Sequence, residues 1–295
     1  MSEQHIEDVV VVGAGPAGLT AGIYLGRFRR SCIVLDDGES RARWIPTSHN
    51  IPGFAAGVGG EHFLNRLKYQ ALKYGARTRR LRVSRITKPD DVFVLDTNHG
   101  PLLGRYVLLA TGVKDHLPAI EGASAAVMRG LLRVCPICDA FEAIDKRIAV
   151  IGDGELGLRE AVFLKNYSSQ VTLLHTSAGK PSTTAQDAPG IERIAVRLSD
   201  LRIQEDRVSL QNAHGLRIFD VVYLALGCSA QHDLALSLNA TCDEKGVLIV
   251  NAHQESSVPR LYAAGDVVRG LNQVIVAAAE SALAATDIHN KLRDG

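Results

Sequence analysis

The strongest constraint on the fold is a strand, a glycine-rich turn, a helix and a second strand in immediate succession near the start of the chain. An apolar strand over residues 8–12 leads into the turn 13–18, and the Ala-rich stretch that follows, to about residue 28, has the composition of a buried helix. A second strand over residues 31–35 ends on Asp36. This order predicts a βαβ unit of the dinucleotide-binding type.

The same order of elements returns over residues 148–174, where a strand, the glycine turn 152–157, a helix and a strand follow one another. Two further strand-to-turn segments, residues 106–112 and 221–227, come at comparable distances after their glycine turns, so the chain looks internally duplicated. We therefore predict an α/β protein with two Rossmann-like dinucleotide-binding domains, the second inserted in the first.

The end of the chain completes the first domain in this prediction. Residues 260–266 have the pattern of a strand that ends in an acid, and a long Ala-rich helix follows without a glycine turn of its own. We expect residues 1–118 and 247–295 to form the first domain and residues 119–246 the inserted one. The links near Pro118 and Gly246 are then the candidate hinges.

The first glycine turn has the residues that a pyrophosphate site needs. Gly13 permits a tight turn, Gly15 lets backbone N–H groups approach the phosphates, and Gly18 lets the helix pack against the sheet. The start of the helix adds partial positive charge. Asp36 is in the position to accept a hydrogen bond from a ribose hydroxyl.

Cys135 and Cys138 are separated by two residues, a spacing that suits either half of a zinc site or a redox dithiol. A zinc site needs two more ligands, and the sequence has no second cysteine pair and no nearby histidine pair. We therefore interpret the pair as a redox dithiol and predict no metal. The adjacent Asp139 can take and return the proton that thiol–disulfide exchange moves.

Charge and composition restrict the partners. The formal net charge is +1, with 46% apolar and 22% charged residues, so no broad electrostatic attraction to nucleic acid or to an anionic membrane is expected. The polar start of the chain and the glycines in the apolar run after it fit neither a signal peptide nor a membrane span. We expect a cytoplasmic protein.

Five segments of the chain match one known family in residues, order and spacing. They are residues 13–18, Asn50-Ile51-Pro52-Gly53-Phe54, Ala110-Thr111-Gly112, residues 135–139 and Ala263-Ala264-Gly265-Asp266-Val267. On these segments the chain resembles the low-molecular-weight thioredoxin reductase family over nearly its full length. That resemblance implies FAD on the first domain, a homodimer, and a dithiol that alternates between the flavin and a disulfide substrate such as thioredoxin through rotation of the inserted domain. By the same resemblance Cys138 faces the flavin, Cys135 attacks the substrate and Asp139 is the acid.

The resemblance also implies which residues contact FAD. They are expected at the first glycine turn, at strand ends and at the start of the last helix. The full set is Gly13, Gly15, Pro16, Ala17, Gly18, Asp36, Asn50, Val83, Ala110, Thr111, Gly112, Gly265, Asp266, Asn272, Gln273 and Val274.

Two segments near the predicted FAD contacts depart from the family pattern. Asn272-Gln273 replaces an Arg-Gln pair, and Glu39-Ser40-Arg41 replaces a Gly-Gly-Gln segment. We expect FAD to bind despite both changes, because most of its contacts in such a fold come from the backbone.

The second glycine turn departs more. The family places a His-Arg-Arg stretch and one further arginine after the strand that follows this turn, where they hold the 2′-phosphate of NADPH. Residues 175–181 contain no arginine, and no acid ends that strand. Asp153 and Glu155 put two negative charges where a pyrophosphate would lie. We therefore predict that NADPH is not the normal electron donor and that ferredoxin or another reduced carrier takes its place.

Three alternatives stay open at this stage. An FAD-dependent dithiol oxidase that passes electrons to oxygen has the same fold and also neglects NADPH. An NADPH-dependent thioredoxin reductase requires that some other residue does the work of the missing arginines. A flavin-bound regulatory protein whose dithiol only senses redox state would lack turnover, and the complete Cys135 to Asp139 segment disfavours it.

Overall fold

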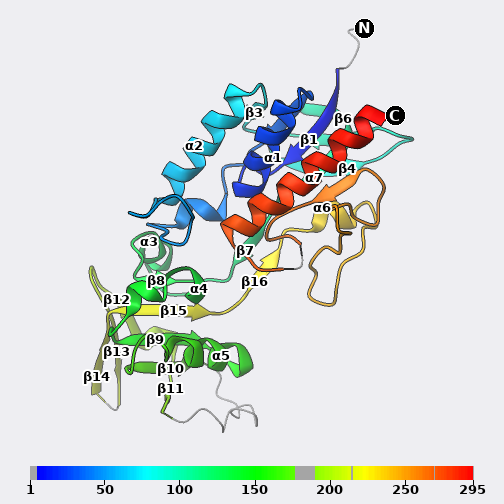
Figure 1. Cartoon of the computed structure of the whole chain (residues 1–295). Helices are drawn as coiled ribbons and strands as arrows, with labels where there is room; N and C mark the ends of the chain where they lie inside the picture. Colours follow the sequence, from blue (N-terminus) through cyan, green and yellow to red (C-terminus); the bar gives the residue numbers. More distant parts are fainter. Residues whose placement is uncertain (1–4, 177–189, 214, 269, 295) are drawn as a thin grey trace. The chain divides into compact units, whose positions relative to one another are not determined.

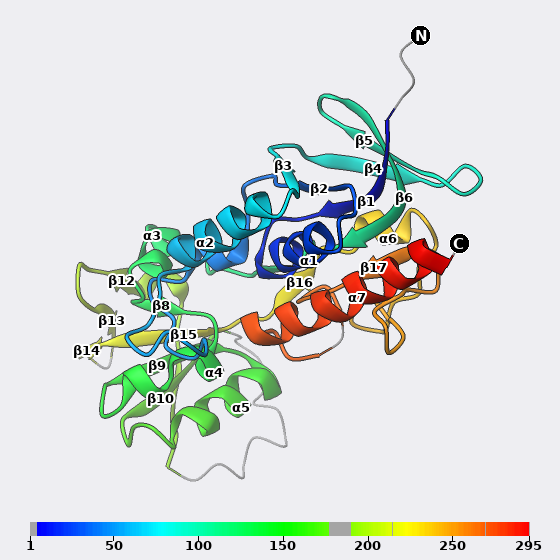
Figure 2. The ribbon, with the colours of Figure 1, turned by 45° about the horizontal axis from the view of Figure 1, so that its top comes forward.

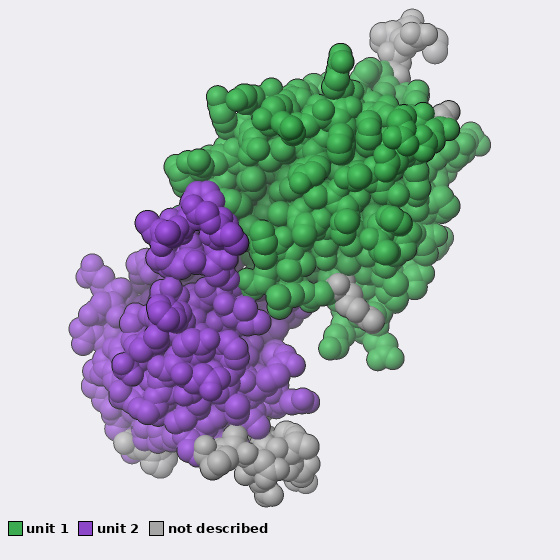
Figure 3. Space-filling model, in the orientation of Figure 1, with its two compact units in different colours: residues 1–43, 59–114, 229–295 green, residues 44–58, 115–228 purple. Residues whose placement is uncertain are grey.

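The computed structural model describes residues 5–176, 190–213, 215–268 and 270–294. The chain forms two compact units, shown in different colours in Figure 3. Unit 1 consists of residues 1–43, 59–114 and 229–295, and unit 2 of residues 44–58 and 115–228. Each is an α/β unit built on a mainly parallel sheet, which confirms the predicted fold class.

Unit 1 is built on a seven-stranded sheet (Figure 1). Its strands, in spatial order, are β3 (Arg77–Arg79), β2 (Cys32–Leu35), β1 (Ile6–Val12), β6 (Gly100–Leu109), β5 (Phe93–Thr97) and β4 (Val83–Thr87), with β17 (Leu261–Ala263) also paired to β6. The run β3-β2-β1-β6-β17 is parallel, and the β6-β5-β4 end is antiparallel. The pairing of β17 with β6 places the last strand in the sheet of unit 1.

Three long helices of unit 1 lie side by side (Figure 2): α1 (Pro16–Arg27), α2 (Gly60–Lys73) and α7 (Val274–Asp294). Helix α1 lies between the other two and contacts both. Strand β2 and residues 9–12 of β1 are buried, as expected for central parallel strands. The short helix α6 (Asp233–Leu236) contacts β4 instead, and Ala235 belongs to the core around Phe93.

Unit 2 repeats this plan with five parallel strands. In spatial order they are β11 (Glu192–Ala195), β10 (Val171–His175), β9 (Ile148–Gly152), β15 (Val221–Ala225) and β8 (Leu132–Arg133). The helices are α3 (Ala123–Met128), α4 (Pro136–Asp139) and α5 (Gly154–Leu164). A three-stranded antiparallel sheet completes the unit, with strands β12 (Leu201–Ile203), β13 (Val208–Asn212) and β14 (Gly215–Phe219). Because β15 stands beside β9 as β6 stands beside β1, the structure has the internal duplication that the sequence predicts.

The unit boundaries differ from the expected ones at 118 and 246. The chain passes between the units within β7 (Val113–Asp115) and β16 (Cys228–Ala230), two strands that pair with each other, and also on either side of the segment 44–58. Residues 229–246 belong to unit 1 because Ala235 and Ala240 are buried in its core. Residues 44–58 belong to unit 2, where Trp44 packs against the core that contains Val222. The inserted domain is therefore better bounded by residues 115–228, with the segment 44–58 added.

Two further observations concern the surface. Among the described helices, none combines the length and the hydropathy that crossing a bilayer requires.

The arginine-rich stretch over residues 77–85 lies along β3 and β4, and its five arginines are all exposed. It is a solvated surface, with Arg77 hydrogen-bonded to Glu7.

Candidate active site

The first glycine turn is packed tightly against the end of β6. Gly13 has φ +111°, and a Cβ atom there would lie 2.2 Å from the carbonyl oxygen of Ala110. A Cβ atom on Gly18 would lie 1.8 Å from the carbonyl oxygen of Gly13. Gly15 is the N-cap of α1, and no described side chain caps the helix start there, so its first-turn N–H groups, including that of Ala17 after Pro16, are suited to an anion.

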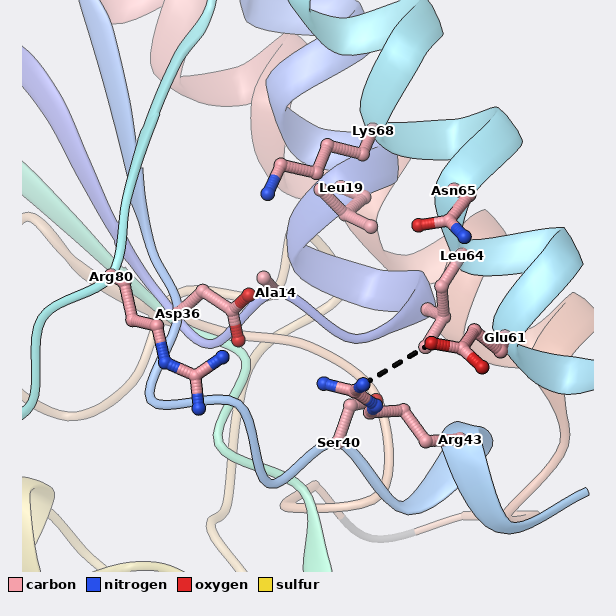
Figure 4. Close-up of a pocket in the computed structure, with 10 residues that line it drawn as sticks. All are labelled: Ala14, Leu19, Asp36, Ser40, Arg43, Glu61, Leu64, Asn65, Lys68 and Arg80. Carbon is pink, nitrogen blue, oxygen red and sulfur yellow. Dashed lines mark hydrogen bonds and ion pairs between the residues drawn. The ribbon is translucent and has the colours of Figure 1, made fainter.

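A pocket of about 130 Å³ lies beside this turn (Figure 4). Figure 4 shows Asp36 between Arg80 and Ala14, and the Oδ1 atom of Asp36 accepts the N–H of Gly38 at 2.8 Å. Lys68 also reaches the pocket from α2. The full lining is Ala14, Leu19, Asp36, Ser40, Arg43, Glu61, Leu64, Asn65, Lys68 and Arg80. An acid suited to a ribose, cations and a phosphate-type turn together fit the adenosine diphosphate part of FAD.

The other predicted FAD contacts in unit 1 follow the parallel strands. Ala110, Thr111 and Gly112 come directly after β6, Gly265 and Asp266 after β17, and Asn272 and Gln273 directly before α7, whose first residue is Val274. The carboxyl ends of parallel strands share one edge of a sheet, which is where ligands bind in open α/β folds. The structure therefore gathers most of the predicted contacts at one edge of unit 1.

Two polar contacts order this edge. Arg41, which belongs to the segment that departs from the family, donates from Nη1 to Oδ2 of Asp266 at 3.1 Å. The N–H of Gly265 donates to Oε2 of Glu280 at 2.7 Å, and burial raises the pKa of that carboxyl. Asp266 is thus held beside a cation that the sequence resemblance did not lead us to expect.

Two predicted contacts do not belong to this edge of the unit 1 sheet. Asn50 lies in the segment 44–58, which belongs to unit 2, and its Oδ1 accepts the hydroxyl of Ser48 at 2.9 Å. Val83 begins β4, and its side chain is buried in the core of unit 1. Both stay predictions as FAD contacts.

The glycine turn gives a first testable prediction. The substitution Gly18→Ala should abolish or strongly weaken FAD binding, because the new Cβ atom would overlap the carbonyl oxygen of Gly13 and displace the turn. Gly157→Ala is the matched control. It crowds the corresponding turn of unit 2, where its Cβ atom would lie 2.7 Å from the carbonyl carbon of Gly152, and it should leave the flavin bound. The flavin-to-protein ratio of the purified variants measures both, and an equal ratio in the two proteins would contradict the placement of FAD on unit 1.

The predicted dithiol is present as a disulfide between Cys135 and Cys138 in unit 2. Cys135 is the N-cap of the short helix α4, Pro136 is its first residue, and the N–H of Cys138 donates to the carbonyl oxygen of Cys135 at 3.0 Å. Both cysteines are half-buried, and Ile137 between them is exposed. The pair is therefore held by local backbone structure and remains partly open to solvent.

The carboxyl group of Asp139 is held by two residues that the sequence analysis did not identify. The hydroxyl of Tyr223 lies 2.9 Å from its Oδ1, and Arg133 donates from Nη1 to the carbonyl oxygen of Asp139 at 2.6 Å and to the Tyr223 hydroxyl at 3.1 Å. Burial raises the pKa of Asp139 to about 6, against the lowering effects of Arg133 and Tyr223. No motif marks these two residues, since Tyr223 sits in an apolar strand and Arg133 two residues before Cys135.

The second glycine turn carries a carboxylate that bonds to the end of the neighbouring strand. Asp153 is the N-cap of α5, and its carboxylate accepts the N–H of Thr176 at 2.9 Å and the hydroxyl of Thr176 at 2.6 Å. Thr176 follows β10 directly, at the strand end where a nucleotide ribose is usually recognised. Glu155 adds a further negative charge in the first turn of the helix. The rest of the predicted phosphate segment, residues 177–181 with Lys180, lies outside the described residues.

Comparison with known proteins identifies the family and supports the fold. Residues 7–281 match the family model described as pyridine nucleotide-disulphide oxidoreductase. A thioredoxin reductase of Treponema pallidum is 29% identical over 94% of this chain and 94% of its own length, and one of Borreliella burgdorferi is 28% identical over 98% and 93%. The crystal structure of thioredoxin reductase from Streptococcus pyogenes superposes with a TM-score of 0.89 at 23% identity, covering 98% of this chain and 99% of that one, and so supports the fold.

Proposed function

Since the chain belongs to the pyridine nucleotide-disulphide oxidoreductase family and is an FAD-dependent disulfide oxidoreductase, we propose that it passes electrons between FAD, the Cys135–Cys138 pair and a protein disulfide such as that of thioredoxin. The observation that carries this proposal is the disulfide followed directly by Asp139, a carboxyl whose pKa burial raises to about 6. An acid with a pKa near neutrality can donate and accept a proton at physiological pH.

The exchange step balances with the residues of unit 2. In the reduced pair, the thiolate of Cys135 attacks one sulfur of the substrate disulfide, and the sulfur that leaves takes a proton from Asp139. The thiol of Cys138 then returns a proton to Asp139 and attacks the sulfur of Cys135. This closes the Cys135–Cys138 disulfide and releases the second substrate sulfur, which takes up that proton. Two electrons pass from the pair to the substrate.

The edge of unit 1 supplies the cofactor site in this proposal. The turn from Gly13 to Gly18 would hold the pyrophosphate, Asp36 the adenosine ribose, and Asp266 the ribityl chain. FAD, when bound, supplies the two-electron chemistry that regenerates the dithiol.

We also propose that the electrons normally come from a donor other than NADPH, such as ferredoxin or another reduced carrier. The support is the carboxylate of Asp153, which is bonded to Thr176 and repels a pyrophosphate at the start of α5. A dithiol oxidase that passes electrons from a bound dithiol to oxygen shares these residues. We propose in addition that the protein is a homodimer and that it works in the cytoplasm, where thiols are kept reduced.

One experiment distinguishes these possibilities. The purified flavoprotein is mixed without oxygen with NADPH, NADH, reduced ferredoxin or dithiothreitol, and the visible flavin absorbance is followed. We expect rapid bleaching with reduced ferredoxin and return of the absorbance when oxidised thioredoxin is added. Bleaching by dithiothreitol alone, reversed by oxygen and not by thioredoxin, would instead establish the dithiol oxidase.

A further inference from the structure

The pairing of two short strands in unit 2 brings an arginine and a tyrosine together beneath the disulfide helix. Strand β8 runs parallel to β15, with Arg133 directly opposite Tyr223. Helix α4 follows β8 after two residues, so Asp139 at its end returns to this pair of side chains. Arg133, Asp139 and Tyr223 thus meet at one point, although the disulfide separates the first two in sequence and Tyr223 lies far from both.

The contacts leave little freedom to any of the three. Tyr223 is completely buried, and its hydroxyl lies between the guanidinium of Arg133 and the carboxyl of Asp139. The other side of the guanidinium is fixed, since Nε of Arg133 donates to the carbonyl oxygen of Gly130 at 3.0 Å. The side chain of Arg133 is 12% exposed and that of Asp139 28% exposed. The carboxyl is the most accessible member, and the two groups that hold it lie on its buried side.

We propose that Tyr223 and Arg133 are positioning residues that hold the Asp139 carboxyl for proton transfer to and from the sulfurs and that set its proton affinity. This inference rests on the proposed function, in which Asp139 supplies the proton to the leaving sulfur. The Tyr223 hydroxyl lies 2.9 Å from Oδ1 and 3.1 Å from the backbone carbonyl oxygen of Asp139, so it holds the Oδ1 side of the residue and leaves Oδ2 as the oxygen for the exchanged proton. The carboxyl therefore has a defined orientation before the substrate arrives.

The surrounding charges determine the sign of the effect. Burial raises the pKa of Asp139 to about 6, the positive charge of Arg133 and the Tyr223 hydrogen bond lower it, and the nearby Glu142 raises it. Helix α5 also packs against α4 and carries Glu160, whose pKa burial raises to about 7. Removing the Tyr223 hydroxyl or the Arg133 charge should therefore raise the pKa of Asp139 further. Because Glu160 titrates near pH 7, the titration of Asp139 has to be distinguished from that of Glu160.

The direct test measures the carboxyl itself. In the oxidised flavoprotein, infrared difference spectra between pH 4 and 9 follow the protonated carboxyl band, which Asp139→Asn assigns. We expect Tyr223→Phe to raise the pKa of Asp139 by about one pH unit, and Arg133→Met by at least as much, as loss of a hydrogen bond or charge next to a carboxylate implies. Arg133→Lys keeps the positive charge, so it should raise the pKa of Asp139 less than Arg133→Met does. An Asp139 pKa that is the same in wild type, Tyr223→Phe and Arg133→Met would overturn the inference.

Matched controls separate positioning from general damage. Tyr167→Phe removes the hydroxyl of another tyrosine of unit 2, which is half-buried and whose ring packs against Phe163. This variant should leave the pKa of Asp139 unchanged. Glu160→Gln should remove a band near pH 7 without moving that of Asp139. Circular dichroism checks that each variant folds. If Arg133→Met does not fold, Tyr223→Phe and Arg133→Lys still decide the outcome.

Thiol exchange supplies a second, independent measurement. The prereduced protein is mixed by stopped flow with oxidised thioredoxin, and the rate of thiol–disulfide exchange is followed over the same pH range. The same rate is measured separately with 5,5′-dithiobis(2-nitrobenzoate). Because Asp139 must be protonated to donate, the rate with thioredoxin should fall as pH rises through its pKa, and this fall should move to higher pH in Tyr223→Phe. If the infrared shift occurs but wild type does not react with thioredoxin, the proposed substrate is wrong and the positioning role stands. If wild type reacts and the pH dependence does not move, the positioning role is wrong.

Discussion

Cys135→Ser is expected to abolish turnover and to produce a broad long-wavelength absorbance that Cys138→Ser lacks. The proposed relay gives the two cysteines unequal roles, with Cys138 meeting the flavin and Cys135 the substrate. Without Cys135, the thiolate of Cys138 remains beside the oxidised ring and can donate charge to it. Visible spectra between pH 6 and 9, with turnover assays on both variants, measure this. Both variants should lose activity, because a single thiol cannot complete the exchange.

The exposed cysteine at the start of β16 provides the control. Cys228→Ser removes a thiol outside the disulfide and should keep both the wild-type spectrum and full turnover. A long-wavelength band in Cys138→Ser instead of Cys135→Ser would reverse the assignment of the two roles. Full turnover in both variants of the disulfide would mean that the pair is structural.

NADPH is expected to reduce the flavin poorly or not at all, because it should bind about a hundredfold or more weaker than at a site that has the phosphate-binding arginines. Each lost charged hydrogen bond to a phosphate costs about 1.5 to 3 kcal/mol, so the loss of two or three such contacts with the missing arginines weakens binding by about a hundredfold or more. The carboxylate of Asp153 adds repulsion at the pyrophosphate position. Anaerobic stopped-flow measurement of bleaching against NADPH concentration gives the apparent affinity.

A charge-matched pair of variants tests the cause of this weakness. Asp153→Asn removes the charge in the turn and should improve reduction by NADPH, whereas Asp206→Asn removes one exposed charge elsewhere in unit 2 and should not. Rapid bleaching of the wild type by micromolar NADPH would contradict the proposal and would point to Lys180 or another residue as a substitute for the arginines.

The sequence predicted the parts of the molecule that depend on local pattern. The turn from Gly13 to Gly18 has the close approaches that only glycine allows, so its fold could be predicted from residue type and spacing. The return of β17 to the first sheet followed from a strand that had no glycine turn of its own. The spacing of Cys135 and Cys138 identified the disulfide, because no other ligands accompany the pair.

Features that depend on contacts between distant segments could not be predicted in this way. The pairing of Arg133 with Tyr223 requires the register between β8 and β15, which neither strand encodes alone. The boundary near residue 228 was missed because Ala235 and Ala240 have no sequence mark that assigns them to one core or the other. The contact of Asp153 with Thr176 joins a turn to a strand end, and the sequence showed only that both segments were unusual.

A reductive titration of the flavoprotein tests the central claim most directly. Dithionite is added in known amounts without oxygen while the flavin absorbance and the free thiols are counted. If Cys135 and Cys138 exchange electrons with FAD, the wild type should take up four electrons per FAD and gain two thiols, and the Cys135→Ser/Cys138→Ser double variant should take up only two electrons and gain no thiol. Two electrons per FAD in both proteins, with the Cys135–Cys138 disulfide still intact in the reduced wild type, would contradict the proposed relay.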